Sequence, residues 1–471
     1  MTRSGFTCAL SVAIALTCGV AQAAAGAPTV NGASGVGDPF FPMSGNGGYD
    51  VSSYDLRLRH SPTNALVRAV AKIRATVATE GEPGPSLRRF NLDFRGPKIT
   101  ELRVGGAPAK HRRKGQELIV TPETPLADGT SFSVRVRYAG KPHPVRDPDG
   151  SKSGWMVTQD GALALGEPRG SPTWFPGNDH PTDKASFRIQ LTTSGRRVGI
   201  SNGRLVDRRR RKGKVTTVWR QKQPMATYLA LVAIGRFDLD RGKVAGRQYV
   251  GAIDSSQART RRKLRDLRQR TRKAHKLLAD VAGPYPFAAT GGVIDPSGLN
   301  YALETQGRPY YPVPPSLGLV VHEIAHQWYG NSVSPARWDQ IWLNEGFATY
   351  LEWLSVERSG GLDAQTRFDR LYNRHGAGQT SFWNPPPAAV PGPAQLFANS
   401  VYVRGAMALQ VLRGAVGDPA FFTILKRWAM DNRGDSVDTD DFRALITEVH
   451  GSVPASFEQW LTQPGKPPPP P

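Results

Sequence analysis

Hydrophobic and polar residues alternate along the first half of the chain with the period of a β-strand. Between residues 49 and 237, runs such as 67–73, 132–138 and 187–191 place an apolar side chain at every second position. Glycine, proline, asparagine and aspartate separate these runs at regular intervals, which is typical of turns between short strands. Because arginine and lysine occupy many alternate positions, we expect one face of the sheet to contact water. The pattern predicts an antiparallel β domain over residues 45–245.

Beyond residue 250 the apolar positions recur with the period of a helix. The segments with this pattern are residues 256–282, 402–415, 421–431, 439–450 and 457–461. Residues 376–396 are rich in proline and glycine and are expected to form a loop, whereas 291–294 and 301–306 have short strand-like patterns. The sequence therefore predicts a second, mainly helical domain over residues 246–463, followed by a proline-rich tail at 464–471.

One of the apolar helices contains the sequence His-Glu-Ile-Ala-His. It is predicted over residues 317–329, with Ser316 as its N-cap and Gly330 as its end. His322 and His326 would lie one turn apart on the same face, so both imidazoles can reach a single metal ion. The alternative for two histidines at this spacing is a packed pair in a hydrophobic core.

An acidic residue downstream favours the metal site over the packed pair. Glu345 follows His326 after eighteen residues, in a second predicted helix that runs to about residue 358. Two imidazoles and a carboxylate leave a fourth tetrahedral position for water, as a catalytic zinc site requires, although other divalent ions accept the same ligands. Glu323 lies beside the metal face of its helix, where a general base for that water is expected. Glu352 shares a face with Glu345 and is expected to orient a ligand histidine.

The surrounding segments resemble the core signature of the aminopeptidase N family of zinc metallopeptidases, which also includes the leukotriene hydrolase. The resemblance is carried by the segments 322–331 (HEIAHQWYGN), 342–348 (WLNEGFA), 45–51 (GNGGYDV), 174–181 (WFPGNDHP) and 283–287 (GPYPF). Gly177 replaces the cysteine that is usual in the fourth of these segments. The resemblance implies an α+β fold, with an N-terminal antiparallel β domain followed by a thermolysin-like, mainly helical catalytic domain that binds one Zn²⁺ ion. Since the chain ends where the family's catalytic domain ends, we expect a short form without the C-terminal helical domain of longer members.

The resemblance also assigns residues to substrate binding. The family's G-x-M-E-N motif corresponds to residues 301–305 (YALET), where the glutamate is kept and the glycine, methionine and asparagine are not. By resemblance, Glu304 binds the free α-amino group of the substrate, Glu167 also holds this amine, and the strand that contains Ala302 pairs with the peptide backbone. Tyr402 matches the family tyrosine whose hydroxyl stabilises the oxyanion of the tetrahedral intermediate.

The chain is strongly basic, with a net charge of +22 and a pI of about 10.2. Cations are concentrated in a predicted hairpin turn at 208–214 and a predicted helix at 259–276. Such a surface could bind nucleic acid, anionic cell-surface polymers or acidic lipid. The alternative is an arginine-rich surface that only maintains solubility, and we favour this explanation of the charge. No helix-turn-helix, zinc-finger or RNA-binding signature accompanies the charge, so we expect no nucleic-acid partner.

The first residues indicate export. Residues 1–23 combine a positive start, an apolar stretch and a small-residue cleavage site, as in a secretory signal peptide, and residues 24–44 are predicted to form a flexible leader. Both cysteines, Cys8 and Cys18, lie in this signal, so the mature chain would have neither disulfides nor a thiol mechanism. No later segment is expected to cross a membrane.

These features together predict a secreted, monomeric zinc aminopeptidase that acts on peptides with a free N-terminus. Two alternatives stay open. One is a zinc endopeptidase or epoxide hydrolase of the same family, since the flanks of Glu304 are altered. The other is a non-catalytic protein that binds anionic surface polymers through its basic clusters.

Overall fold

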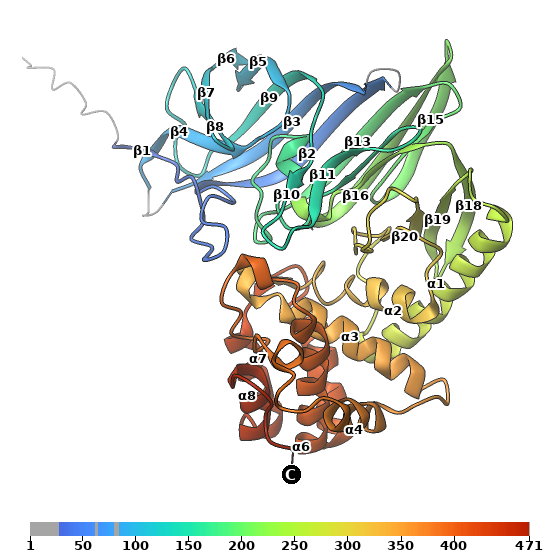
Figure 1. Cartoon of the computed structure of the whole chain (residues 1–471). Coiled ribbons are helices and arrows are strands. Elements are labelled where there is room, and N and C mark those ends of the chain that lie inside the picture. The colour runs from blue at the N-terminus through green and yellow to red at the C-terminus, as the bar shows by residue number, and fades with distance from the viewer. Residues whose placement is uncertain (1–27, 62–64, 80–83, 471) are drawn as a thin grey trace, which may run out of the picture.

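The computed structural model describes residues 28–61, 65–79 and 84–470, which form a β domain and a mainly helical domain (Figure 1). The predicted signal segment at 1–23 lies outside the described residues. Among the helices of the described part, none is long and apolar enough to cross a lipid bilayer. A β domain followed by a mainly helical domain confirms the α+β class that the sequence predicts.

The β domain is built on an eight-stranded sheet with the strand order β15-β16-β13-β2-β3-β9-β5-β6. The strands are β2 (Gly48–Ser61), β3 (Leu66–Ala78), β5 (Lys98–Val104), β6 (Ala107–Pro108), β9 (Ser131–Gly140), β13 (Lys184–Ser194), β15 (Arg204–Arg211) and β16 (Lys214–Ala226). Neighbours pair in antiparallel fashion as predicted, except that β13 pairs with β2 in parallel. This exception arises because a long connection, rather than a hairpin, separates the two strands.

Two smaller sheets complete the β domain. One has the order β1-β4-β8-β7 and the other the order β10-β11-β12-β17-β14. Their strands are β1 (Thr29–Asn31), β4 (Ser86–Asp93), β7 (Lys110–Lys114), β8 (Glu117–Thr121), β10 (Val145–Arg146), β11 (Lys152–Val157), β12 (Ala162–Leu165), β14 (Val198–Ser201) and β17 (Val232–Gly235). Buried side chains from all three sheets, such as Leu56, Leu118 and Ala164, belong to one hydrophobic core.

The leader packs against the protein over its described part, residues 28–44, so the prediction of a flexible leader is wrong there. Strand β1 pairs with β4 in parallel. The buried carboxylate of Asp38 accepts a hydrogen bond of 2.8 Å from the backbone N–H of Trp338 in the helical domain, and lies 3.3 Å from Nε2 of His180 in the β domain. A buried carboxylate that satisfies backbone donors holds this segment in place, which the small, glycine-rich composition does not reveal.

The helical domain begins with a sheet of order β18-β19-β20-β21 and continues as helices. Its strands are β18 (Phe237–Val244), β19 (Arg247–Asp254), β20 (Ala289–Ile294), β21 (Tyr310–Tyr311), β22 (Ser334–Pro335) and β23 (Ser436–Val437). Its helices are α1 (Thr260–Ala282), α2 (Leu317–Ala325), α3 (Trp342–Glu357), α4 (Ala364–Arg374), α5 (Thr380–Trp383), α6 (Asn399–Asp431), α7 (Thr439–His450) and α8 (Ala455–Thr462). Short 3₁₀ helices are η1 (Ser171–Thr173), η2 (Thr227–Leu229), η3 (Trp338–Gln340) and η4 (Pro393–Gln395).

The predicted helices are present with small differences. Helix α6 joins the predicted segments 402–415 and 421–431 across a kink at Gly417, where φ is 77°. The predicted loop at 376–396 contains α5 and η4. The strand-like segment 301–306 is not a strand, because its one β-bridge, between Leu303 and Tyr310, only closes the turn formed by residues 304–309.

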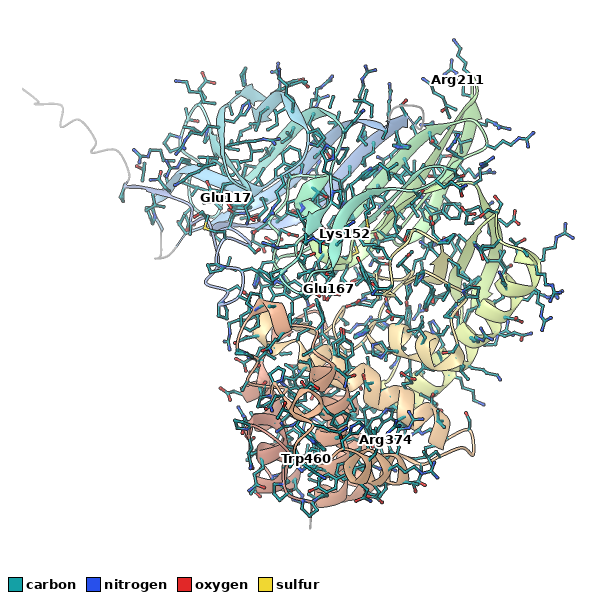
Figure 2. The ribbon with its side chains drawn as sticks, viewed as in Figure 1. Glu117, Lys152, Glu167, Arg211, Arg374 and Trp460 are labelled. Carbon is teal, nitrogen blue, oxygen red and sulfur yellow. The ribbon has the colours of Figure 1, made fainter. Side chains whose placement is uncertain are left out.

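The two basic clusters lie where the sequence places them. The hairpin β15–β16 turns at Lys212 and Gly213, and its arginines 208–211 extend along the exposed strand β15. Figure 2 shows Arg211 near the tip of this hairpin, with its side chain directed away from the protein. The second cluster forms the solvent face of α1, whose apolar side packs on β18, β19 and α2.

A lysine of the β domain forms hydrogen bonds with the helical domain. The Nζ atom of Lys184 donates hydrogen bonds to the carbonyl oxygens of Ser332, Gly434 and Asp435, at 3.0, 3.1 and 2.7 Å. All three acceptors belong to loops that follow α2 and α6, so this side chain connects the β domain to two loops of the helical domain.

We expect Lys184→Met to lower the free energy of unfolding by about 1–3 kcal/mol, because it leaves three carbonyl groups without their donor. Chemical denaturation of the purified wild type and variant measures the difference in their free energies of unfolding. The matched control is Arg188→Met, on the same strand, whose ion pair with Asp55 is half exposed and should contribute less than about 1 kcal/mol. Equal losses in the two variants would contradict a specific role for Lys184.

Candidate active site

Helix α2 carries His322, has His326 as its C-cap residue, and is shorter than predicted. It begins after Ser316, whose side chain caps the first turn, and ends at Ala325 rather than at residue 329. Backbone N–H groups of residues 327–329 still donate to carbonyls three or four positions earlier, and this turn leads to Gly330, where φ is 127°. The backbone N–H of His326 still donates to the carbonyl of His322 at 3.2 Å, and the two rings meet edge to face, with centroids 4.8 Å apart and an angle of 79° between their planes.

Helix α3 brings the third donor to these histidines. Oε2 of Glu345 lies 3.3 Å from Nε2 of His322 and 3.4 Å from Nε2 of His326. One donor atom from each of the three residues falls within 4.8 Å of the others, and among the described residues this is the only group of His, Cys, Asp or Glu with such spacing. The structure thus confirms that these three residues converge on one point.

The outer contacts of the histidines fit a zinc site. Nδ1 of His326 lies 3.2 Å from the carbonyl oxygen of Tyr329, and Nδ1 of His322 lies 4.0 Å from Oε2 of Glu352. Each ring therefore presents Nε2 to the centre while its other nitrogen faces an acceptor, which is how ligand histidines are oriented in proteins. Two imidazole nitrogens and one carboxylate are a donor set that zinc accepts.

The electrostatics of the cluster favour positive charge at this point. Burial lowers the pKa of His326, but the carboxylates of Glu345 and Glu304 outweigh burial and raise it to about 10. Burial raises the pKa of Glu345, but the two histidines outweigh it and lower this pKa to about 2. A buried carboxylate that stays ionised beside imidazoles is suited to binding a cation.

Glu323 lies next to the cluster with a free oxygen. Its side chain is buried, and Oε2 has no hydrogen-bond partner. Burial raises the pKa of Glu323 well above its usual range, and the nearby carboxylates Glu304 and Glu345 raise it further. A carboxylate whose pKa is raised is a stronger base than an exposed carboxylate, which suits a group that accepts and returns a proton.

Two further carboxylates form a pair on the other side of the cleft. Glu304, in the turn after β20, and Glu167, in the loop after β12, are both buried, and each has an Oε1 atom without a hydrogen-bond partner. Burial raises the pKa of both carboxyl groups; the charge of Glu304 raises that of Glu167 further. Glu304 is only 2% exposed, so its carboxylate is not a surface group.

Tyr402 enters the site from the first turn of α6. Its ring lies nearly parallel to that of His322, with 6.2 Å between the centroids and an angle of 14°. Burial raises the pKa of the Tyr402 phenol well above its usual value, and surrounding carboxylates such as Glu345 raise it further. The phenol therefore stays protonated and able to donate a hydrogen bond.

These residues share one cleft of about 840 Å³ between the two domains. Figure 2 shows Glu167 at the boundary between the domains. The charged and catalytic-type residues that line the cleft are Asp149, Glu167, Glu304, His322, Glu323, His326, Glu345, Glu352 and Tyr402, and Ala302 lines it as well. No lysine or arginine is among its described lining residues, although the whole chain carries a charge of +22. The cleft is thus an acidic region in a basic protein and attracts cations.

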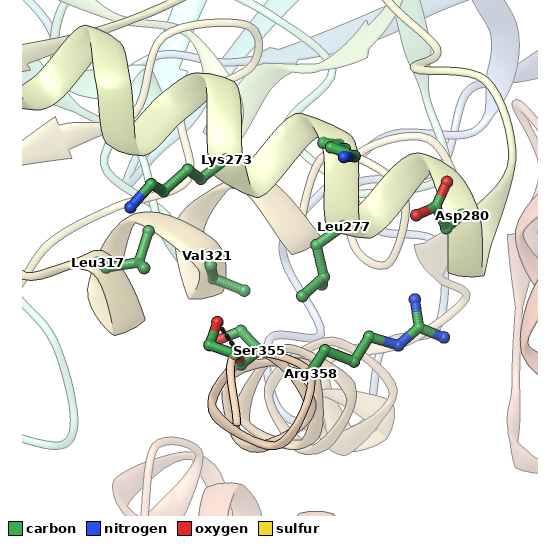
Figure 3. Close-up of a pocket in the computed structure, with 9 residues that line it drawn as sticks. Lys273, Leu277, Asp280, Leu317, Val321, Ser355 and Arg358 are labelled. Atoms are coloured by element: carbon green, nitrogen blue, oxygen red, sulfur yellow. Dashed lines mark hydrogen bonds between the residues drawn. The ribbon is translucent and has the colours of Figure 1, made fainter. Parts of the chain in front are cut away.

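A second hollow of about 490 Å³ lies on the other side of α2, between α1 and α3 (Figure 3). Leu277, Leu317 and Val321 form an apolar floor, and Lys273 and Arg358 stand at the rim. This hollow contains no histidine and a single acidic residue, so it does not have the groups that hydrolysis requires.

Sequence reasoning assigned no role to two amide side chains in the site. Gln327 and Asn331 follow the second histidine and are fully buried. Both donate hydrogen bonds to the backbone carbonyl of Glu304, at 2.9 and 2.8 Å. The sequence did contain a signal for these two residues, because polar amides in an otherwise apolar, buried segment need hydrogen-bond partners.

A β domain packed on a helical domain, with two histidines and a distant glutamate at the cleft between them, is the architecture of two-domain zinc metallopeptidases. Residues 51–229 match the Peptidase M1 N-terminal domain and residues 316–460 match the Peptidase family M1 domain. The chain belongs to peptidase family M1.

Solved and curated proteins resemble the chain to different extents. The crystal structure of an M1 zinc metallopeptidase from Deinococcus radiodurans is 28% identical, with a TM-score of 0.83, and the match covers 93% of this chain and 99% of that one. Aminopeptidase M1-D of Oryza sativa subsp. japonica is 26% identical over 62% of this chain, and leucyl aminopeptidase of Saccharolobus solfataricus is also 26% identical over 62%. The matches span 36% and 40% of the lengths of these two relatives.

Proposed function

We propose that this protein is an exported zinc aminopeptidase that removes single residues from the free N-terminus of peptides. The observation that carries the proposal is the pair Glu304 and Glu167, whose buried carboxylates lack partners and face the same cleft as the metal-binding residues. Buried carboxylates of this kind bind an ammonium group. The names of the relatives support the same activity.

His322, His326 and Glu345 would hold the zinc ion. When bound, zinc supplies Lewis-acid chemistry, which polarises a carbonyl and acidifies water. Glu352 would orient the ring of His322, because its carboxylate faces the Nδ1 atom of that histidine. The backbone around Ala302 would bind the extended peptide and direct its first peptide bond toward this centre.

Two residues of the chain would act on the reacting groups. Glu323 takes the proton of the attacking water on Oε2 and then gives it to the nitrogen of the leaving amine. The phenol of Tyr402 donates a hydrogen bond to the oxygen on which negative charge develops. Both side chains line the cleft, and Glu323 has no competing partner at Oε2.

Aminoacyl fluorogenic amides, free and N-acetylated, test the proposal with the purified protein. We expect hydrolysis of the free compounds only, since an acetylated nitrogen is uncharged and cannot pair with Glu304. Hydrolysis of both forms at similar rates would instead indicate an endopeptidase, the alternative suggested by the altered residues around Glu304.

Tyr402→Phe is expected to lower kcat by about 100-fold with little change in KM, because it removes one donor to the oxyanion and keeps the ring. Steady-state kinetics on a free aminoacyl amide measures this. Tyr372→Phe, a half-buried tyrosine on α4 outside the cleft, is the control and should keep full activity. A Tyr402 variant with wild-type kcat would contradict the assigned role.

We further propose that the protein is secreted as a monomer and associates weakly with anionic cell-surface polymers. Residues 1–23 support export, and the exposed arginines of β15 and α1 support the association. Cell fractionation, light scattering and salt-dependent retention on an anionic resin test these three points. Retention that does not change between low and high salt would argue against the association.

A further inference from the structure

The turn that carries Glu304 is held from the β domain on one side. The backbone N–H of Gln306 donates to the carbonyl of Leu229 at 3.3 Å, and Nδ2 of Asn202 donates to the carbonyl of Gln306 at 3.0 Å. Within the turn, the hydroxyl of Thr305 donates to the carbonyl of Arg308 at 2.6 Å. Thr305 stands where the G-x-M-E-N motif has asparagine, and here its side chain closes the turn.

The other side of the turn is held by the segment that follows the metal-binding helix. Nε2 of Gln327 donates to the carbonyl of Glu304 at 2.9 Å and to the carbonyl of Glu323 at 3.1 Å. Oε1 of the same amide accepts a hydrogen bond of 2.7 Å from the N–H of Gly307. Nδ2 of Asn331 donates to the carbonyl of Glu304 at 2.8 Å. One backbone carbonyl therefore accepts two buried side-chain donors.

In this arrangement the backbone carbonyl of Glu304 has hydrogen-bond partners and one oxygen of its side-chain carboxylate has none. Its backbone carbonyl is fully hydrogen-bonded, whereas Oε1 of its side chain has no partner and is buried in the cleft. The main chain is thus fixed and the carboxylate is left for a ligand. Gln327 is the residue next to His326, so the same short segment positions a metal-binding imidazole and the amine-binding residue.

We propose that Gln327 and Asn331 are positioning residues that set the distance between the metal-binding histidines and the Glu304 carboxylate. This inference rests on the proposed aminopeptidase function. One residue of extended peptide spans only about 3.3–3.6 Å, so a shift of an ångström moves the first peptide bond out of reach once the amine is bound. The two amides thereby restrict cleavage to one residue from the N-terminus, even though the residues around Glu304 differ from the G-x-M-E-N motif.

The test compares two ligands that share a metal-binding group and differ in the amine. Leucine hydroxamate has the α-amino group, and its desamino analogue, 4-methylpentanoic hydroxamate, lacks it. In Gln327→Met and in Asn331→Leu, calorimetry should show about 10-fold weaker binding of leucine hydroxamate, as expected for losing a buried hydrogen bond. Binding of the desamino compound should change less than about 2-fold, with zinc content unchanged. KM for a free aminoacyl amide should rise more than kcat falls.

Gln410→Met is the matched control, since Gln410 is also a buried amide but contacts Tyr350 and Gln365 away from the cleft. It should bind both ligands as the wild type does. Should Gln327→Met not fold, Asn331→Ala removes the other donor without adding a charge and carries the same expectation.

Equal weakening of both ligands in the Gln327 and Asn331 variants, or no weakening at all, would overturn the inference. A wild-type protein that binds the two compounds equally would instead overturn the proposed function, because the amine would then have no binding site.

Discussion

Glu323→Gln is expected to lower kcat on the order of 1,000-fold, because an amide cannot take the proton of the attacking water. Glu323 is not among the residues that converge on the metal position, so zinc content should stay the same. The substitution keeps the size of the side chain and removes a buried carboxyl group whose pKa is raised by burial. The folded state should therefore be at least as stable as the wild type.

Kinetics with a free aminoacyl amide, together with metal analysis of the same sample, measures the effect of Glu323→Gln. The control is Glu357→Gln on α3, which breaks a pair with Arg413 outside the cleft and should retain activity. Activity of the Glu323 variant within about 10-fold of wild type would assign the base to another residue.

Removing the metal with a chelator is expected to abolish hydrolysis and to lower Tm by about 5 °C or more, since a tightly bound ion stabilises only the folded state. The physical reason is the concentration of buried negative charge, because Glu345, Glu304 and Glu323 all raise the pKa of their neighbours. A cation relieves this repulsion. Activity and Tm should both return when zinc is added.

Differential scanning fluorimetry with and without chelator measures the shift in Tm. The control is His326→Gln, which lacks one ligand and should show almost no shift on chelation. A wild-type protein that loses activity in chelator but keeps its Tm would show that the metal contributes nothing to the stability of the fold.

The metal cluster was predictable because its residues are spaced by the helix itself. His322 and His326 are one turn apart whether α2 ends at residue 325 or 329, so the error in the helix end did not matter. The partner Glu345 was identifiable because residues around it match a family signature. Alternating residues likewise predicted the β domain, since a period of two identifies a half-buried strand.

Contacts that bring distant segments together were not predictable from local patterns. The composition of residues 28–44 indicates flexibility, yet the buried carboxylate of Asp38 ties this segment to Trp338, which lies 300 residues further along the chain. The alternation around Glu304 suggests a strand, but the carbonyl of Glu304 accepts hydrogen bonds from the side chains of Gln327 and Asn331 rather than from a neighbouring strand. In both places a side chain satisfies backbone groups that would otherwise form regular structure.

The central claim is the removal of one residue at a time from a free N-terminus, and mass spectrometry of a peptide digest tests it most directly. The substrate is one unlabelled peptide of about ten residues, used with a free and with an acetylated N-terminus. We predict a ladder of products from the free peptide, each shorter by its first residue, and no products from the acetylated peptide. Internal fragments from both peptides would contradict the account, since cleavage would then not depend on the amine that Glu304 and Glu167 are proposed to bind.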